Sequence, residues 1–157
     1  MTHKELVKRA ERWLLNTAGC KFVLAELTSR ATETPDAIGW KEGRSILVEC
    51  KTSRSDFLND QRKLFRKNPR LGMGIFRFYL CPPGVIKPKE LPEKWGLLYC
   101  HSDRVKKVVA PKKKPSAFRN PANLQAEIEL LCSALRRVHV RGDLQKIYNS
   151  VLGEVNG

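Results

Sequence analysis

Two short apolar segments joined by one turn signal constrain the fold of this chain more than any other feature. Residues 35–40 and 44–51 are both β-rich, and Glu42-Gly43 between them is typical of a tight hairpin turn. The second segment carries Ile46-Leu47-Val48 in succession, as expected for a central strand covered on both faces. The pair therefore predicts an antiparallel hairpin in the interior of a sheet.

Helical and strand-like patterns alternate along the rest of the 157 residues. They predict helices over residues 2–15, 53–67, 123–138 and 143–151, and strands over residues 21–27, 35–40, 44–51, 72–81, 95–100 and, as a weaker candidate, 105–110. The order α-β-β-β-α-β, then a further strand and a helical tail, predicts an α/β fold with a mixed sheet.

The length suits a single globular unit. Residues 1–110 are expected to form its core. Residues 111–122, which include Lys112, Lys113 and Lys114, read as a basic, extended linker. Residues 123–157 are expected to form C-terminal helices that pack on the core.

Three charged residues interrupt the two apolar segments of the hairpin. Glu49 and Lys51 are two apart on one strand, so their side chains share a face. Counting back from the turn places Asp36 near the level of Glu49. Because a buried charge normally has a partner or a ligand, two carboxylates and one ammonium are predicted to converge on one patch of the sheet.

Such a trio suits the hydrolysis of a phosphodiester bond. Mg²⁺ prefers oxygen ligands, which Asp36, Glu49 and the backbone carbonyl of Cys50 can supply, and Mn²⁺ is expected to substitute for it. The metal would activate a bound water, and Lys51 would orient that water or stabilise the developing charge on phosphate. A purely structural ion pair between Glu49 and Lys51 is the alternative.

Pro35-Asp36, a hairpin, and then Glu49-Cys50-Lys51 resemble the motif of the PD-(D/E)xK nuclease superfamily. This resemblance implies a restriction-endonuclease-like α-β-β-β-α-β core. It also implies that Asp36 and Glu49 are metal ligands and that Lys51 is the catalytic lysine.

The segment 49–60, which contains Ser53-Arg54 and Asp56-Phe57, is similar to the MmcB-related group of DNA repair proteins within that superfamily. Residues 79–82 and 95–98 fit later pieces of the same pattern, which covers roughly residues 5–105 and leaves out the linker and tail. The resemblance also implies a further metal ligand at Glu26. Asp56 and Asp60 are interpreted as helix-capping and local pairing residues.

Lysine and arginine total 30 against 16 acidic residues, a net charge of +14, which favours a nucleic acid as partner. Basic residues near the proposed site or in the linker are candidate phosphate contacts. They are Arg30, Lys41, Arg44, Lys63, Arg66, Lys67, Lys112, Lys113 and Lys114.

The five cysteines form no metal-binding spacing and read as small buried residues of a reducing compartment. With no apolar run long enough to span a bilayer, a cytoplasmic protein is expected. The predicted function is Mg²⁺-dependent DNA cleavage of low sequence specificity, or specific for DNA structure, in repair, recombination or mobile-element biology. RNA as substrate, a catalytically weak binding module, and a subunit acting with a partner protein or as a homodimer remain alternatives.

Overall fold

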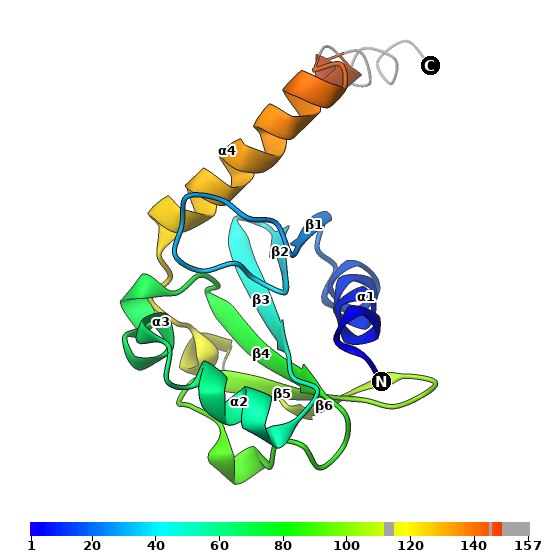
Figure 1. The fold of residues 1–157 in the computed structure, drawn as a ribbon, viewed down its shortest axis with the longest axis vertical. Helices are drawn as coiled ribbons and strands as arrows, with labels where there is room; N and C mark the ends of the chain where they lie inside the picture. The colour runs from blue at the N-terminus through cyan, green and yellow to red at the C-terminus, as the bar shows by residue number, and fades with distance from the viewer. Residues whose placement is uncertain (112–114, 145, 149–157) are drawn as a thin grey trace.

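The computed structural model describes residues 1–111, 115–144 and 146–148 of the chain. Its centre is a six-stranded mixed sheet in the sequential order β1-β2-β3-β4-β5-β6 (Figure 1). The strands are β1 (Phe22–Ala25), β2 (Ala37–Lys41), β3 (Arg44–Cys50), β4 (Phe76–Cys81), β5 (Trp95–Cys100) and β6 (Val105–Val109). The neighbours β3/β4 and β4/β5 are parallel and the other pairs are antiparallel, so the predicted α/β fold with a mixed sheet is confirmed.

The predicted hairpin is present and has a two-residue turn. Lys41 pairs with Arg44, and the two residues between them, Glu42 and Gly43, have φ of 50° and 70°. Two positive φ values are the signature of a type I′ turn, whose twist matches that of the flanking strands. The turn fixes the register, and β3 lies between β2 and β4 as predicted for a central strand.

Helices cover both faces of the sheet (Figure 1). On one face lies α1 (His3–Trp13), which runs on into a π-helical turn (Leu14–Ala18). On the other lie α2 (Arg54–Asp60), α3 (Leu64–Lys67) and the start of α4 (Leu124–Arg141). Short 3-10 turns occupy Pro69–Leu71, Pro88–Glu90 and Pro115–Phe118. Within the described residues, no helix is both long and apolar enough to cross a membrane.

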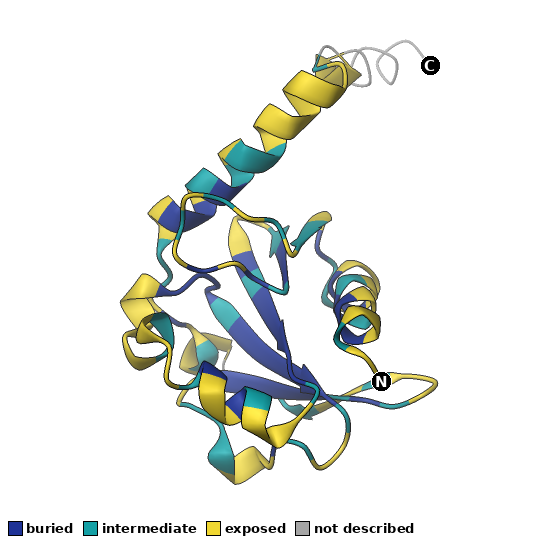
Figure 2. Ribbon diagram, in the orientation of Figure 1, coloured by how far each residue is buried: buried dark blue, intermediate teal, exposed yellow. Residues whose placement is uncertain are grey.

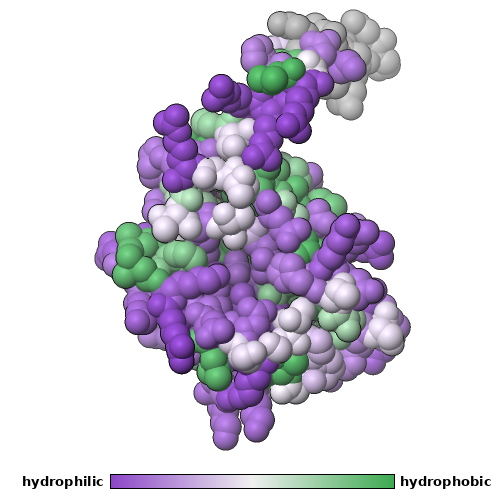
Figure 3. Space-filling model, in the orientation of Figure 1, coloured by the Kyte–Doolittle hydropathy of each residue, from purple (hydrophilic) through white to green (hydrophobic). Residues whose placement is uncertain are grey.

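Two apolar layers sandwich the sheet, which is buried along most of its length (Figure 2). Leu6, Ala10 and Trp13 of α1 pack in the layer on one face. Phe57 of α2 and Leu130 of α4 pack in the layer on the other. The outer surface is mainly hydrophilic on the side that Figure 3 shows.

The single helix predicted over residues 53–67 is wrong, because α2 and α3 are separate. Lys63 between them has extended backbone, with φ of −62° and ψ of 142°. Arg66 forms an ion pair with Asp60. Six residues apart on one continuous helix, these side chains would point about 120° apart around the axis and lie about 9 Å apart along it, so they would not pair. The break therefore lets the chain turn back and bury the Arg66 side chain.

The C-terminal region matches the prediction in part. Asn123 caps α4 by accepting a hydrogen bond from the Ala126 amide at 3.1 Å. Only the first turns of α4 pack on the core, through Ala126, Glu127 and Leu130, whereas the distal half projects from the body (Figures 1 and 2). Of the helix predicted over residues 143–151, residues 146–148 are helical, whereas residues 145 and 149–151 lie outside the described residues.

Glu127 anchors α4 to the sheet. One oxygen of its buried carboxylate accepts hydrogen bonds from the Ser45 hydroxyl and the Gly74 amide, both at 2.8 Å. Glu127→Ala should therefore lower the free energy of unfolding by roughly 1–3 kcal/mol, because it leaves buried donors unpaired. Glu129→Ala, on the same helix, is the matched control and should change it little. Urea denaturation measures both, and equal losses would rule out the anchor.

Candidate functional site

The hairpin brings Asp36 to the end of β3, as the sequence predicts. Ala37 pairs with Val48, so the preceding residue lies level with Glu49. The Cys50 amide donates a hydrogen bond to Asp36 Oδ2 at 2.7 Å. The Asp36 side chain is only 17% exposed, so its carboxylate is held at the mouth of the site rather than in open solvent.

Glu49 and Lys51 meet on one face of the sheet, also as predicted. Lys51 Nζ lies 3.3 Å from Glu49 Oε2, and the two side chains are 5% and 3% exposed. Burial alone would lower the pKa of Lys51, but the charges of Glu49 and Asp60 raise it above its ordinary value. Lys51 is therefore a cation held in place by carboxylates.

Further groups extend this pair into a buried ion cluster, made of Glu33, Glu49, Lys51, Asp60 and Arg66. The Arg66 guanidinium pairs with Glu33 Oε1, with Glu49 Oε2 at 3.1 Å and with Asp60 Oδ2 at 2.8 Å. Lys51 Nζ lies 3.3 Å from Asp60 Oδ1. The cluster thus balances three carboxylates against two cations in the interior.

Neighbouring groups complete the cluster. Tyr79 donates its hydroxyl to Asp60 Oδ2 at 2.8 Å, and the Met73 amide donates to Glu33 Oε2 at 2.6 Å. Burial raises the pKa of Glu33. Burial would also raise that of Asp60, but Arg66 and Lys51 hold it well below its usual range. Asp60 pairs locally with Lys63, as predicted, and is in addition part of the ion cluster. Asp56 lies in the first turn of α2, as predicted for capping.

The pKa of Asp36 is shifted in the opposite direction from that of Asp60. Burial, followed by the charge of Glu49, raises the pKa of its carboxyl to about 7, although the Cys50 amide, Lys51 and His3 oppose the rise. Glu49 Oε1 is buried and accepts no hydrogen bond within the described residues. Two carboxylates that disfavour each other's charge, one with an unused oxygen, would gain from a shared cation.

The donor set fits a hard divalent cation better than a soft one. Asp36 and Glu49 offer oxygens, and the carbonyl of Cys50 is close to both in sequence and register. Mg²⁺ commonly takes one or two carboxylates and completes its shell with water and phosphate. Within the described residues, no group of three or more His, Cys, Asp or Glu side chains is arranged to hold a metal.

His3 and Glu26 lie beside Asp36. His3 Nε2 is 3.4 Å from Asp36 Oδ1 and 3.3 Å from Glu26 Oε1. The Glu26 amide donates to the Asp36 carbonyl at 3.1 Å, although the Glu26 side chain is half exposed. The sequence identified Glu26 through the resemblance alone, and it gave no signal for His3, which lies 33 positions before Asp36.

The predicted phosphate contacts are scattered rather than gathered at the site. The Arg66 side chain is 2% exposed and belongs to the buried ion cluster, so its expected surface position is wrong. Lys63 is half exposed and pairs with Asp60 at 2.8 Å. Arg30 and Lys67 are exposed. Lys112, Lys113 and Lys114 lie outside the described residues.

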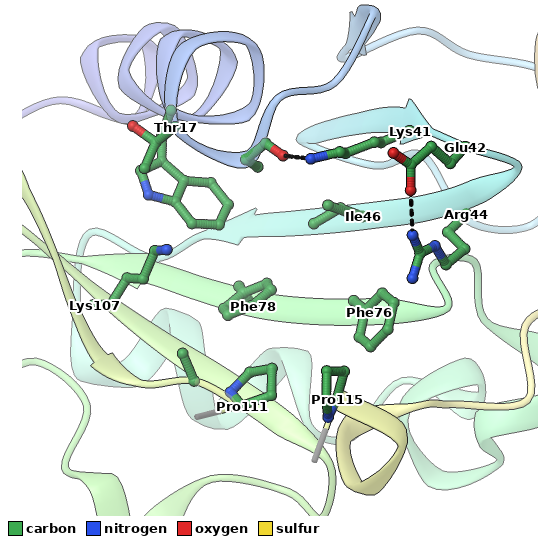
Figure 4. A pocket seen from close by; sticks show the side chains of 13 residues that line it. Thr17, Lys41, Glu42, Arg44, Ile46, Phe76, Phe78, Lys107, Pro111 and Pro115 are labelled. Carbon is green, nitrogen blue, oxygen red and sulfur yellow. Dashed lines mark hydrogen bonds and ion pairs between the residues drawn. The ribbon is translucent and has the colours of Figure 1, made fainter. Parts of the chain in front are cut away.

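Lys41 and Arg44 flank the hairpin turn, at the opposite end of β3 from Glu49. Arg44 lies five residue steps of strand from Glu49, roughly 17 Å, so the expected place at the rim of the site is wrong for both basic residues. They line a pocket of about 340 Å³ whose apolar wall includes Phe76 and Phe78 (Figure 4). Arg44 pairs with Glu42 there.

Arg66 should contribute more to stability than any exposed arginine. Removing it leaves Glu33, Glu49 and Asp60 buried without their shared partner, which costs roughly 3–5 kcal/mol. Arg66→Ala is therefore expected to unfold at a much lower urea concentration than the parent. Arg62→Ala, an exposed neighbour, should stay within about 0.5 kcal/mol of it. Comparable stability of the two variants would contradict the cluster.

No protein-family model matches the chain, and no curated protein matches it. Among solved structures, the chain is similar to the SPO1766 protein of unknown function from Silicibacter pomeroyi. The TM-score is 0.60 and the sequence identity 22%, covering 91% of this chain and 93% of that chain. At this identity the likeness shows a shared fold alone. The chain thus has an α/β fold that another protein adopts over nearly its whole length.

Proposed function

We propose that this chain is a Mg²⁺-dependent nuclease that hydrolyses phosphodiester bonds of DNA. The observation that carries the proposal is the meeting of Asp36, Glu49 and Lys51 at the ends of two neighbouring strands. Two carboxylates beside an ammonium supply a cation site and a proton-handling group within one patch. A PD-(D/E)xK assignment, proposed on the sequence motif, uses the same three residues.

Each residue then has a distinct task. Asp36 and Glu49 would hold Mg²⁺, with the Cys50 carbonyl as a further oxygen donor, and the bound metal would lower the pKa of a water and polarise the phosphate. Lys51, fixed by Glu49 and Asp60, would orient that water or stabilise charge on the phosphate oxygens. Its ion pairs preorganise the ammonium before substrate arrives.

The charge of the chain supports a polyanionic substrate. A net charge of +14 attracts nucleic acid regardless of sequence. Because the basic residues are dispersed, the contacts suit backbone recognition, and we propose cleavage of low sequence specificity or cleavage directed by DNA structure. Repair, recombination and phage or mobile-element biology would use such an activity. RNA is the alternative substrate, and a cleavage assay on both DNA and RNA distinguishes the two.

One observation favours a second function, nucleic-acid binding without cleavage. Glu49 and Lys51 are almost fully enclosed, and Arg66 already neutralises the Glu49 carboxylate. If the Glu49 carboxylate is already fully paired with Arg66, it holds no metal, and the ion cluster serves only as a structural core beneath a basic binding surface. Cleavage and metal binding decide between the two functions, since the second predicts neither.

Asp36→Asn should lower the rate of Mg²⁺-dependent cleavage by on the order of 100-fold or more, while the protein stays folded. Glu49→Gln and Lys51→Ala should abolish it too, but with a loss of stability, because both residues belong to the buried ion cluster. Glu42→Gln, an exposed carboxylate on the same hairpin, is the control. The assay compares linear, nicked, branched and single-stranded DNA and RNA, with Mg²⁺, Mn²⁺ or EDTA. Full cleavage activity of Asp36→Asn would contradict the proposed nuclease site.

The stability of the metal-free protein should depend on the protonation of Asp36. Its folded pKa of about 7 lies above the ordinary 3.8, so the folded state binds the proton more tightly. Protonation of Asp36 therefore makes its full contribution to the free energy of unfolding below about pH 4, and this contribution is lost as pH rises toward 7. In EDTA, Asp36→Asn should match wild type near pH 4 and exceed its stability at pH 7, by no more than about 4 kcal/mol.

Saturating Mg²⁺ at pH 7 should reverse this order, because the ion binds only the folded wild type. Thermal melts at the two pH values, with EDTA and with Mg²⁺, give all four comparisons. A variant that melts below wild type in EDTA at pH 7 would instead identify Asp36 as half of a structural ion pair.

A further inference from the structure

A pocket of about 340 Å³ lies at the hairpin end of β3, on the face of the sheet that α1 covers. We call it the hairpin pocket, and its lining includes Trp13, Lys41, Arg44, Phe76, Phe78 and Lys107. The hydrogen bond from Tyr79 to Asp60 places the buried ion cluster on the other face. The volume of the pocket is typical of a site for a small ligand, and the three proposed catalytic residues do not line it.

The floor of the hairpin pocket is aromatic and fixed in place. Phe76 and Phe78 are two residues apart on β4, so both rings stand on the same face (Figure 4). The Phe78 ring packs edge-on against Trp13, with ring centroids 5.3 Å apart. It also lies over Gly96, where a Cβ would come within 2.3 Å of the ring. Phe76 is only partly buried, so its ring is the part of the floor that a ligand can reach.

Basic side chains stand at both ends of this aromatic floor. Lys107 lies at one end, with its ammonium 5.9 Å from the centre of the Trp13 ring. Lys41 and Arg44 flank the hairpin turn at the other end (Figure 4). Glu42 pairs with Arg44, but the two side chains are 64% and 44% exposed. Because solvent weakens an exposed ion pair, an anionic ligand can compete with Glu42 for the guanidinium.

This combination fits one unpaired nucleotide of a single strand. Bases stack on aromatic rings whatever their sequence, and basic side chains bind the phosphates. A nucleotide within a strand has a phosphate on either side, and the pocket has cations at both ends of its floor. An apolar ligand would leave those cations unused, and a lone phosphate would leave the aromatic floor unused. A base inside a duplex is already covered on both faces by its neighbours.

We propose that the hairpin pocket binds one unpaired nucleotide of a single-stranded nucleic acid, with the base on Phe76 and the adjacent phosphates on Arg44 and Lys107. The inference rests on the proposed function for the choice of nucleic acid as partner, but it uses none of the residues proposed for cleavage. It gives that function a preferred class of substrate, which is nucleic acid with an unpaired segment.

Fluorescence anisotropy of a labelled oligodeoxythymidylate in EDTA measures binding without cleavage. Phe76→Leu keeps an apolar side chain but removes the stacking face, so it should weaken binding of the single strand about fivefold or more. Phe22→Leu is the matched control, because Phe22 is 46% exposed on β1 and does not line the pocket. It should bind as the wild type does.

A DNA duplex of the same length separates stacking from damage to the fold. The wild type and Phe76→Leu should bind the duplex equally, because paired bases cannot lie on the ring. Equal affinity of the two proteins for the single strand would overturn the proposal. So would an equal loss of affinity for the duplex, or a wild type that does not bind the single strand.

The dependence of affinity on salt tests the phosphate contacts. Arg44→Gln and Lys107→Gln should each reduce the slope of log affinity against log salt by about 0.7, the value for one phosphate on a single strand. Phe76→Leu should leave the slope unchanged, because stacking releases no counterion. Arg136→Gln, an exposed position on α4, is the control and should also leave it unchanged. A wild-type slope in both Arg44→Gln and Lys107→Gln would overturn the assignment of these cations.

The same proteins separate this inference from the nuclease proposal. Asp36→Asn should bind the single strand in EDTA as the wild type does. If Phe76→Leu binds normally while Asp36→Asn loses cleavage, the pocket assignment is wrong and the nuclease proposal stands. If Phe76→Leu loses single-strand binding but the wild type cleaves nothing, the pocket assignment stands and the nuclease proposal is wrong.

Discussion

A buried guanidinium must be neutralised and hydrogen-bonded, and in this protein that requirement connects three distant segments. Arg66 reaches Glu33 in the segment between β1 and β2, Glu49 on β3 and Asp60 at the end of α2. The break between α2 and α3 lets Arg66 turn back to these partners. The candidate site depends on the same interaction, since Glu49 is both a member of the ion cluster and the neighbour of Asp36.

The local parts of the fold and site could be predicted from the sequence because short-range rules determine them. The Glu42-Gly43 turn sets the hairpin register, and that register alone brings Asp36 to the level of Glu49. The alternation of side chains along β3 then puts Glu49 and Lys51 on one face. Three residues of the candidate site are therefore fixed by a single turn and a single strand.

The remaining residues could not be predicted because their contacts are long-range. Arg66 was expected to be a phosphate contact like the other basic residues, although its partners lie up to 33 positions away, and no sequence pattern singled out Glu33. His3 reaches Asp36 only because α1 packs across the sheet. For α4 the helix was predictable from its apolar spacing, but not which apolar positions the core would leave exposed.

The central claim is that Asp36 and Glu49 form a cation site, and direct binding of Mn²⁺ tests it most closely. Free aqueous Mn²⁺ gives a sharp electron paramagnetic resonance signal that falls when the ion binds protein. Titration at pH 8, where Asp36 is charged, should show that the wild type removes about one equivalent of free ion. Asp36→Asn should leave that ion in solution, with Glu42→Gln behaving as wild type. The same free signal for wild type and Asp36→Asn would contradict the claim.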